Sequence, residues 1–478
     1  MVDRIETGVK GLDEVAEGGF PKGSLILLAG EPGTGKTAFS MQFLVKGCEL
    51  NESSVYVGFA EARDTLITNF SKHLDMDLAG LEVEGKLKIL DFTAMREEAV
   101  SDILEAVLRE VNALKAGRLV IDSFSALAQA FKEPIDVRII VHTVLSRIAR
   151  GLGCTTVMIE EVPIGESRIG LGMEEFVADC VLRLKASELD GRLFRDMEII
   201  KLRGTKLKER KLAYTLEGGF KAFPPFKPKP IEKPNRFQPI LDPPGKYSTG
   251  SENLDKVLDG GFNEGDTALL EIGENVSISE YHLVLVPMML NFIAQGRGIL
   301  LIPSPGVDVE KARAVGLSYG LTDDEINRLL RVCEPRSLSR GRGEGKPYVA
   351  QFDLEDPWKA YLKYVRLEKE LRRMTGQPVI CVTSVNTLLN YFDEATCEKI
   401  LGQDAARISK GRSLGILIVK PGYEKLTTRL SSIATIHLKL VREHGCLFLY
   451  SLKPRTSLYA VEMDVSKGYP LPKLTPIV

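Results

Sequence analysis

Short, almost wholly apolar runs alternate along the first half of the chain with longer segments of helical periodicity. Four such runs are SLILLAG, SVYVGFA, RLVIDS and TTVMIEE (residues 24–30, 54–60, 118–123 and 155–161). Residues 36–48 instead place Phe39 and Phe43 four positions apart, on one face of a helix. Short apolar runs are typical of strands buried on both faces. The alternation predicts an α/β fold with a mostly parallel sheet flanked by helices.

The second half of the chain repeats the first. ETGVKGLDEVAEGGFPKGSLILLAGE, from Glu6, aligns with STGSENLDKVLDGGFNEGDTALLEIGE, from Ser248. A shared frame of this length at fixed spacing indicates duplication of one structural unit. We therefore expect two tandem domains of the same fold, over residues 1–221 and 247–478.

Residues 222–246, between the two copies, carry eight prolines from Pro224 to Pro244. Proline at this density cannot continue a helix or a central strand. The segment is predicted to be a semi-rigid extended linker. The alternative is a strap that packs along one of the domains.

A glycine-rich segment joins the first predicted strand to the first long helix. It satisfies G-x-x-x-x-G-K-[ST], in which glycines let backbone N–H groups surround phosphate oxygens. The lysine reaches the β- and γ-phosphates of ATP, and the following hydroxyl can bind Mg²⁺. Asp122 ends the strand RLVIDS, where the second metal ligand of such a site is expected. The predicted contacts of the loop are Gly30, Glu31, Pro32, Gly33, Thr34, Gly35, Lys36, Thr37 and Ala38, with Thr37 and Asp122 as the Mg²⁺ ligands.

Motifs beyond this loop resemble the KaiC-like branch of the RecA superfamily. They are TGVKGLDEVAEGGFPKGSLILLAGEPGTGKT, VIDSFSAL, CTTVMIEE, MEEFVADCVLRLK and MEIIKLRGT, which occur in family order and cover most of residues 5–218. The resemblance implies two RecA-like domains and an ATPase that assembles into a homo-oligomeric ring, commonly a hexamer. ATP would then be held between subunits.

The resemblance also assigns roles within KLRGT. It implies that Lys201 and Arg203 reach the γ-phosphate held by a neighbouring subunit, with Leu202 and Thr205 in the same nucleotide-contacting segment. The family's histidine two residues after the threonine is Leu207 here, so one interface contact is expected to be missing.

The carboxylate that activates water is expected after the second strand. Family members often carry paired glutamates there, whereas this chain has Ala60 and Glu61. We predict Glu61 as the activating residue, with Glu160 as a distant substitute. If the first position were the true base, hydrolysis would be slow or absent.

The second copy lacks these chemical groups. Lys36 aligns with Ile278, or with Ser279 if one residue is inserted, and Thr383 and Pro305 replace Asp122 and Glu61. This copy is predicted to be a non-catalytic scaffold or docking layer. Lys453 and Arg455 align with Lys201 and Arg203, so this copy either keeps a ring-interface role or retains a basic strand end for solubility.

Two other segments of the second copy carry candidate functional residues. Ser431 and Ser432 match the segment that is phosphorylated in KaiC, but without ATP in this copy hydrogen-bonded strand hydroxyls are expected instead. Residues 337–348, SLSRGRGEGKPY, are predicted to form a loop that could touch a partner or nucleic acid.

Composition narrows the choice of function. The 63 basic and 65 acidic residues leave a net charge of −2, which disfavours a dedicated nucleic-acid binder. No signal peptide or membrane span is evident, and seven scattered cysteines without a CxxC pair are expected to be buried thiols of a cytoplasmic protein. The expected function is an ATP-driven regulatory switch with a regulatory protein partner. The alternatives are a recombinase-like DNA repair ATPase, and an assembly protein that binds ATP without significant hydrolysis.

Overall fold

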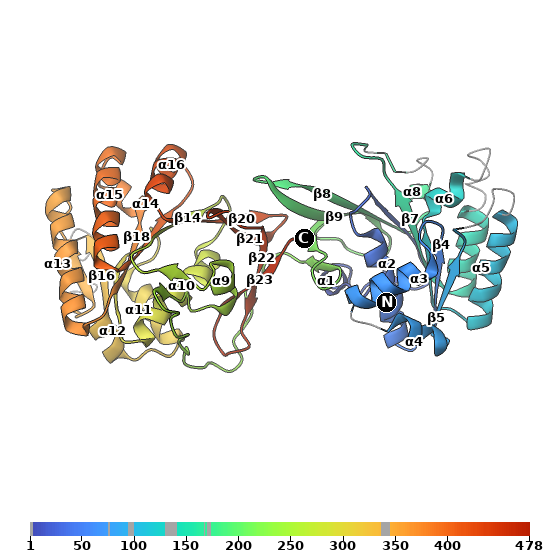
Figure 1. The fold of residues 1–478 in the computed structure, drawn as a ribbon, viewed down its shortest axis with the longest axis horizontal. Helices are drawn as coiled ribbons and strands as arrows, with labels where there is room; N and C mark the ends of the chain where they lie inside the picture. The colour runs from blue at the N-terminus through green and yellow to red at the C-terminus, as the bar shows by residue number, and fades with distance from the viewer. Residues whose placement is uncertain are drawn as a thin grey trace. The chain divides into compact units, whose positions relative to one another are not determined.

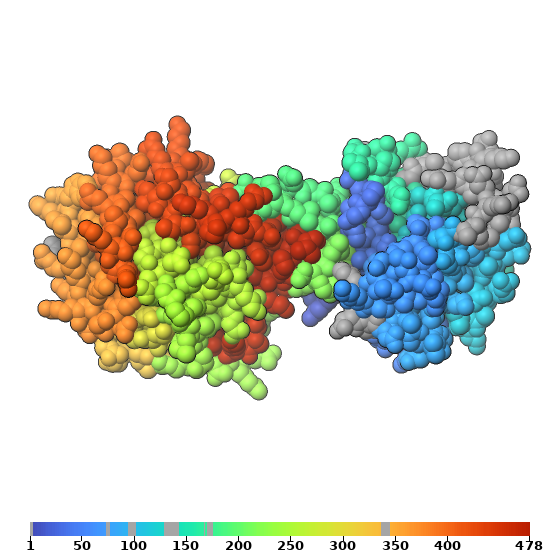
Figure 2. Space-filling view, viewed as in Figure 1, coloured from blue at the N-terminus to red at the C-terminus, as the bar shows by residue number. Residues whose placement is uncertain are grey.

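The structure is a computed structural model. The chain forms two compact units (Figure 1). The first unit comprises Met1–Pro225, His444–Cys446 and Pro476–Val478, and the second comprises Phe226–Glu443 and Leu447–Thr475. Figure 2 shows their side chains, coloured along the sequence as in Figure 1. The described residues are 3–74, 77–93, 100–129, 141–166, 168–169, 174–335 and 345–478.

The first unit is built on a nine-stranded sheet of order β11-β10-β9-β8-β3-β7-β6-β4-β5. In sheet order, each neighbouring pair of strands between β5 and β8 is parallel. The remaining pairs, from β8 through β9 and β10 to β11, are antiparallel. The strands are β3 (Leu25–Gly30), β4 (Ser54–Gly58), β5 (Leu87–Asp91), β6 (Arg118–Asp122), β7 (Thr155–Glu161), β8 (Cys180–Leu189), β9 (Arg192–Leu202), β10 (Lys211–Thr215) and β11 (Lys221–Phe223).

Helices cover both faces of this sheet. They are α1 (Lys10–Val15), α2 (Lys36–Glu49), α3 (Arg63–Leu74), α4 (Leu78–Val83), α5 (Val100–Leu114), α6 (Phe124–Gln129) and α8 (Glu174–Val177), with π-helical turns at Val141–Leu145 and Arg147–Gly151. Phe39 and Phe43 of α2 pack with Ile26 and Leu28 of β3 in one buried cluster, whereas Leu27 packs with α5 in another. The alternation of β3 side chains between two cores explains why its sequence is apolar at every position.

The second unit has a ten-stranded sheet of order β17-β16-β15-β18-β19-β14-β20-β21-β22-β23. Its strands are β14 (Thr267–Ile272), β15 (Gly298–Ile302), β16 (Leu330–Pro335), β17 (Val349–Phe352), β18 (Val379–Ser384), β19 (Leu414–Val419), β20 (Ile436–Glu443), β21 (Cys446–Lys453), β22 (Tyr459–Asp464) and β23 (Leu471–Pro476). Its helices are α9 (Glu252–Val257), α10 (Ile278–Ala294), α11 (Val309–Ser318), α12 (Asp323–Leu329), α13 (Pro357–Thr375), α14 (Val385–Leu389), α15 (Glu394–Gly411) and α16 (Glu424–Ile433). Residues of α10 to α12 pack on one face of this sheet, and residues of α13 to α16 pack on the other (Figure 1).

The two units repeat one topology. The order β4-β6-β7-β3-β8 in the first unit recurs as β15-β18-β19-β14-β20 in the second. Each unit also opens with a two-stranded ribbon around a short helix, β1 (Arg4–Ile5) with β2 (Phe20–Pro21), and β12 (Lys246–Tyr247) with β13 (Phe262–Asn263). The predicted fold class, two tandem RecA-like α/β domains, is confirmed.

Most of the proline-rich segment packs along the second unit. Phe237 is buried in its core, and the Phe237 N–H donates to the carbonyl oxygen of Tyr319 at 2.9 Å. The Ile240 N–H donates to Oδ1 of Asn291 at 2.8 Å. From Phe226 onward the segment therefore has the contacts of a strap on this unit.

The cysteines and the helices bear on two further expectations. All seven cysteines are buried thiols without a disulfide partner, as predicted. Within the part of the chain that the structure describes, no helix combines the length and apolar character needed to cross a membrane.

Candidate nucleotide site in the first unit

The glycine-rich loop connects β3 to α2 with the backbone geometry that a phosphate site needs. Gly33 and Gly35 have φ angles of 76° and 91°, in the left-handed region that side chains disfavour. A Cβ on Gly35 would also lie 2.7 Å from the Leu216 side chain. Gly35 is the N-cap of α2 and supplies no side-chain hydrogen bond to the helix. The first N–H groups of α2 therefore remain available to an anion, which the helix dipole also favours.

Lys36 is held at the centre of the loop. Its Nζ donates to the carbonyl oxygens of Gly30 at 2.9 Å and Glu31 at 3.0 Å. Burial lowers the pKa of this amine, against the opposing charges of Glu161 and Asp122. A phosphate group beside the ammonium would offset that desolvation, so the loop fits a nucleotide.

Neighbouring elements fix the shape of the loop. The Tyr214 hydroxyl donates to the Thr34 carbonyl oxygen at 2.6 Å, and Arg195 Nη1 donates to that of Gly33 at 3.0 Å. The Thr34 hydroxyl donates to the Glu31 carbonyl oxygen at 2.7 Å. The loop is thus ordered by the protein itself, which reduces the entropic cost of binding.

Thr37 and Asp122, the two predicted Mg²⁺ ligands, lie side by side. The Thr37 hydroxyl donates to Asp122 Oδ2 at 2.7 Å, and the Tyr56 hydroxyl donates to the same oxygen at 2.8 Å. Burial raises the pKa of the Asp122 carboxyl despite these two hydrogen bonds. A hydroxyl and a buried carboxylate are the hard oxygen ligands that Mg²⁺ prefers, so the pair fits this ion. Sequence reasoning missed Tyr56, since a tyrosine inside a strand carries no signal of its partner.

Among the acidic residues around the loop, Glu161 rather than the expected Glu160 has a charge that acts on the site. Glu61 follows β4 and accepts a hydrogen bond from Asn69 Nδ2 at 2.9 Å. Glu160 is buried, with 4% of its surface exposed, whereas Glu161 is exposed and its charge acts on both Lys36 and Asp122. Successive residues of a strand point to opposite faces, so only one of these two glutamates can face the loop. Glu161, which the sequence analysis does not single out, is therefore a better candidate than Glu160 to replace Glu61 as the carboxylate that activates water.

Lys201 and Arg203 lie toward the amino-terminal end of β3, whereas the loop of their own unit follows the carboxyl end of that strand. Lys201 of β9 pairs with Val181 of β8, and the Arg203 N–H donates to the carbonyl oxygen of Asp179 at 3.0 Å. Asp179 Oδ2 in turn accepts from the N–H of Leu25, the first residue of β3. The loop begins where β3 ends, which is roughly 16 Å further along the strand.

The other two predicted contacts in this segment lie near Lys201 and Arg203. Leu202 is buried and pairs with Cys180, and the Thr205 hydroxyl accepts from Arg4 Nη2 at 2.8 Å. Within one chain the structure therefore joins the predicted loop residues to Asp122 but not to the KLRGT segment.

The corresponding loop of the second unit is closed by its own side chains. It has the same length: Gly35 follows the end of β3 by five residues, and Ser277 follows the end of β14 by five. Ile278 is therefore the counterpart of Lys36, and no inserted residue is needed. Ser277 and Glu280 form a capping box, in which Glu280 Oε2 accepts from the Ser277 N–H at 2.6 Å.

The strand that corresponds to β6 also ends without an acid. The Thr156 N–H donates to the Ser24 carbonyl oxygen, and the Gly415 N–H donates in the same way to that of Asp266, so Thr156 and Gly415 occupy equivalent positions in the two units. In the register of the neighbouring strands, the residue equivalent to Asp122 is then Ser384. The expected counterpart, Thr383, is one residue earlier.

Lys453 occupies a setting like that of Lys201. Each lysine is at the end of a strand that follows a hairpin, and each Nζ donates to a carbonyl oxygen near the end of a helix: Lys201 to Glu175 at 3.0 Å, and Lys453 to Ala434 at 2.7 Å. The alignment of the two lysines has a structural counterpart, although an interface role for Lys453 and Arg455 remains a prediction.

Ser431 and Ser432 lie in helix α16, so the expectation of strand hydroxyls is wrong. Ser431 Oγ is 2.8 Å from His437 Nδ1, and the Ser432 hydroxyl donates to the Arg429 carbonyl oxygen at 2.6 Å. The basic loop predicted at 337–348 lies largely outside the described residues, which resume at Gly345.

A parallel sheet of RecA order, with a glycine-rich strand–loop–helix connection and a hydroxyl–carboxylate pair beside it, is the arrangement of a P-loop nucleotide-binding protein. Residues 5–220 match the ATPase family described as KaiC, and residues 236–313 match the family described as GvpD basic region 2. The UPF0273 protein of Thermotoga maritima is 34% identical over 225 residues, which are 44% of this chain and 91% of that protein. The chain therefore belongs to the KaiC-like ATPase family.

Two further proteins are similar to this chain. Protein GvpD2 of Halobacterium salinarum is 25% identical over 484 residues, covering 95% of this chain and 94% of that protein. A solved structure of a KaiC-like protein from Pyrococcus horikoshii is 35% identical and is covered completely by 47% of this chain, with a TM-score of 0.42. Residues 236–313 here carry 6 basic and 11 acidic side chains, so the basic character in that family's description does not transfer to this chain.

Proposed function

We propose that the first unit binds Mg-ATP and hydrolyses it slowly, within a homo-oligomeric ring, commonly a hexamer in this family. The second unit is then a non-catalytic layer that docks a regulatory protein partner. The observation that carries this proposal is the cluster of Lys36, Thr37 and Asp122 at an open helix N-terminus. Nucleotide that bridges two subunits would couple hydrolysis to a change in their interface.

The residues of the first unit divide the chemistry among them. The α2 N–H groups and Lys36 bind the phosphates, and Thr37 and Asp122 hold Mg²⁺, which when bound neutralises developing phosphate charge. Glu61 orients the attacking water. Asn69 donates to the Glu61 carboxylate at 2.9 Å and so restrains it.

Lys201 and Arg203 complete the site of a neighbouring subunit in this proposal. Along the strand direction Arg203 lies roughly 16 Å and Lys201 roughly 10 Å from the end of β3, with β8 in between, which supports action in trans because neither side chain spans that distance. Arg203 is exposed, and its Nη1 lies 3.3 Å from Asp179 Oδ1, so a neighbour's phosphate can compete for it. A positive group supplied in this way contributes about 10³–10⁵ in rate in related phosphate-transfer enzymes.

A second candidate function is assembly on bound ATP without significant hydrolysis. Ala60 at the first position of the glutamate pair favours it, because one possible base is missing. A recombinase-like activity remains the third candidate, and salt-dependent binding of single-stranded DNA is its test.

The decisive experiment measures phosphate release and particle mass with and without Mg-ATP. We expect Lys36→Ala and Arg203→Ala to abolish release, Glu61→Gln to lower it about 100-fold with ATP still bound, and the exposed control Lys208→Ala to leave it unchanged. Absent release with intact assembly would favour the assembly protein. If the wild type neither binds ATP nor assembles, the proposal fails.

Mixing two inactive variants tests action in trans directly. Equal amounts of Lys36→Ala and Arg203→Ala chains, allowed to exchange subunits, should recover about a quarter of wild-type activity, because that share of random interfaces pairs an intact loop with an intact arginine. No recovery after demonstrated exchange would contradict a shared site.

A further inference from the structure

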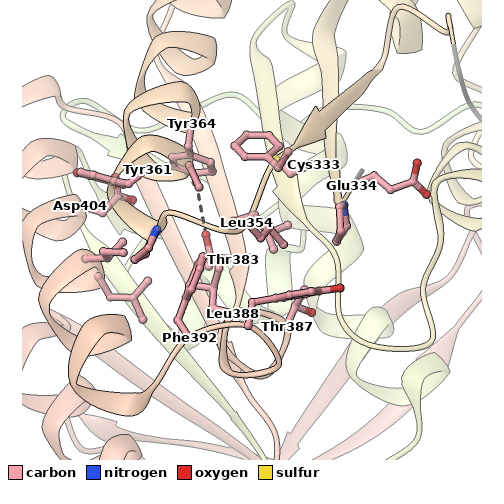
Figure 3. Close-up of a pocket in the computed structure, with 18 residues that line it drawn as sticks. Cys333, Glu334, Leu354, Tyr361, Tyr364, Thr383, Thr387, Leu388, Phe392 and Asp404 are labelled. Carbon is pink, nitrogen blue, oxygen red and sulfur yellow. Dashed lines mark hydrogen bonds between the residues drawn. The ribbon is translucent and has the colours of Figure 1, made fainter. Parts of the chain in front are cut away.

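A cavity of about 70 Å³ lies at the carboxyl edge of the second unit's sheet. Its lining includes the ends of four parallel strands: Ile302 of β15, Pro335 of β16, Phe352 of β17 and Thr383 of β18. Helices α13, α14 and α15 close the remaining sides (Figure 3). Open α/β sheets bind ligands at this edge, beyond the carboxyl ends of their strands.

Aromatic rings dominate the wall of this cavity. Phe352, Tyr361, Tyr364, Tyr391 and Phe392 all contribute to it, from strand β17, helix α13 and the turn between α14 and α15. Such walls favour a flat ring, which can stack on a face or meet an edge. A water needs about 10–15 Å³ by the same measure, so the space suits a single six-membered ring.

Two buried hydroxyls that line the cavity are only weakly paired with each other, and that of Tyr364 also interacts with the Cys381 thiol. The oxygens of Tyr364 and Thr383 are 3.4 Å apart, whereas a good hydrogen bond between hydroxyls is about 2.8 Å long. Figure 3 shows this contact as the dashed line, with Leu354 and Leu388 nearby. Both side chains are almost fully buried, so a hydroxyl group on a ligand would gain partners that water cannot easily supply.

The charged groups around the cavity are already engaged or directed elsewhere. Asp404 Oδ1 accepts from Arg407 Nε at 2.8 Å and pairs with Nη2 at 2.7 Å, and Arg407 Nη1 lies 3.0 Å from Glu368. The Glu334 carboxyl also lines the cavity, with Oε2 buried and without a hydrogen-bond partner, but it turns away from the Tyr364–Thr383 pair (Figure 3). An anionic ligand would therefore lose its hydration without gaining a counter-charge, and a cation drawn to Glu334 would leave the two hydroxyls unmatched.

We propose that this cavity binds a small, uncharged, single-ring aromatic molecule that carries one hydroxyl group. The ring stacks among the aromatic side chains, and the hydroxyl lies beside the Tyr364 and Thr383 oxygens, within hydrogen-bond reach of both. The second unit thereby acts as a small-molecule binding domain, built at the strand end where the first unit holds a metal ligand.

The chain contains a natural reporter of this site. Trp358 is its only tryptophan; it follows the cavity residue Pro357, and its ring is 6.3 Å from that of Tyr361. Ligand entry should change the fluorescence of Trp358. The test is a titration of the full-length protein with phenol, toluene, benzoate and benzylammonium, with ligand-observed NMR as a second readout.

We expect saturable phenol binding with a dissociation constant on the order of 0.1–1 mM. Ala360→Leu should fill the cavity and weaken phenol at least tenfold. The matched control Ala312→Leu, in a separate cavity of about 60 Å³ beneath α10 and α11, should change it less than twofold. Thr383→Val keeps the shape, and should weaken phenol about fivefold while leaving toluene unchanged.

Three results would overturn the proposal. They are the absence of saturable phenol binding to the wild type by both readouts, binding of benzoate or benzylammonium as tightly as phenol, and undiminished phenol binding in both Ala360→Leu and Thr383→Val. The last comparison does not depend on Ala360→Leu folding, because Thr383→Val replaces one side chain with another of the same shape.

Discussion

The loops after β3 and β14 have equal length and connect equivalent strands and helices, but they present opposite chemistry to an anion. In the first unit Gly35 leaves the α2 N–H groups uncapped and Lys36 follows it. In the second unit Ser277 and Glu280 cap α10, and Arg442 pairs with the Glu280 carboxylate at 3.1 Å. One loop needs a ligand to satisfy its donors, and the other supplies its own acceptors.

This difference shows that the fold and the site are separable. Topology and core come from apolar strands and helices, which both units retain. The phosphate site depends on a few loop residues whose replacement leaves the core untouched. A capping box even stabilises the helix locally, so the loss of the site in the second unit need not weaken its fold.

The largest expected effect comes from giving the first loop the residue of the second. Lys36→Ile should weaken ATP binding at least 100-fold, because a buried charge-assisted contact to phosphate, worth about 3 kcal/mol, is lost. The measurement is the ATP-induced rise in melting temperature. The reverse change, Ile278→Lys, should create no binding while the Glu280 carboxylate stays at the helix N-terminus. ATP affinity within tenfold of wild type in Lys36→Ile would contradict the assignment of the loop.

Removing the helix cap tests whether the second loop stabilises its own unit. Glu280→Ala should destabilise the second unit by about 2–3 kcal/mol, because it removes a cap and breaks the ion pair that the buried carboxylate makes with Arg442. Denaturant unfolding followed by Trp358 fluorescence reports on this unit. The exposed neighbour Glu274 is the control, and Glu274→Ala should cost less than about 0.5 kcal/mol. Equal losses in both variants would remove the structural role given to the capping box.

Asp122 should reveal a conflict between stability and binding. Burial raises the pKa of its carboxyl, so the folded unit binds this proton more tightly than the unfolded chain does. Its contribution to stability is therefore most favourable below the unfolded-chain pKa, and declines as pH rises through the folded value. Asp122→Asn should stabilise the ligand-free protein at neutral pH by about 1 kcal/mol and abolish Mg²⁺-dependent ATP binding.

Unfolding at several pH values checks the sign of this effect. The stability difference between Asp122→Asn and the wild type should grow from acidic toward neutral pH. A difference that shrinks over that range would mean that the carboxylate is favoured by its surroundings.

The two adjacent glutamates should behave differently. Glu161→Gln should tighten ATP binding about threefold, because it removes a negative charge that acts on the loop. Glu160→Gln changes a buried side chain on the other side of the strand, and should leave affinity within experimental error. Calorimetric titration of both variants makes the comparison. The same change in both would contradict the alternation seen in β7.

The last prediction is that Mg-ATP leaves the second unit chemically unchanged. Incubation with Mg-ATP should leave the intact mass of the chain unchanged, because the unit that contains Ser431 lacks a phosphate loop and the Ser431 Oγ is hydrogen-bonded to His437. A gain of one phosphate that Ser431→Ala removes would show that ATP reaches this helix.

The reach of sequence reasoning differed between elements for physical reasons. The strands, α2 and the loop were predicted well because each is specified by contiguous residues. The choice between Glu160 and Glu161 depends on which residue of β7 faces the loop, and RLSSIATIHL fits a strand as well as the helix and strand that it forms. The contact of Tyr56 with Asp122 and the cavity near Thr383 arise from residues far apart in the chain, so no local pattern announces them.

The number of nucleotides bound per chain tests the central claim most directly. Equilibrium dialysis with a non-hydrolysable ATP analogue and Mg²⁺ should give one nucleotide per chain for the wild type and none for Lys36→Ala. Two nucleotides per wild-type chain, or one retained by Lys36→Ala, would contradict the account, because either result places a nucleotide in the unit whose loop is closed by Ser277 and Glu280.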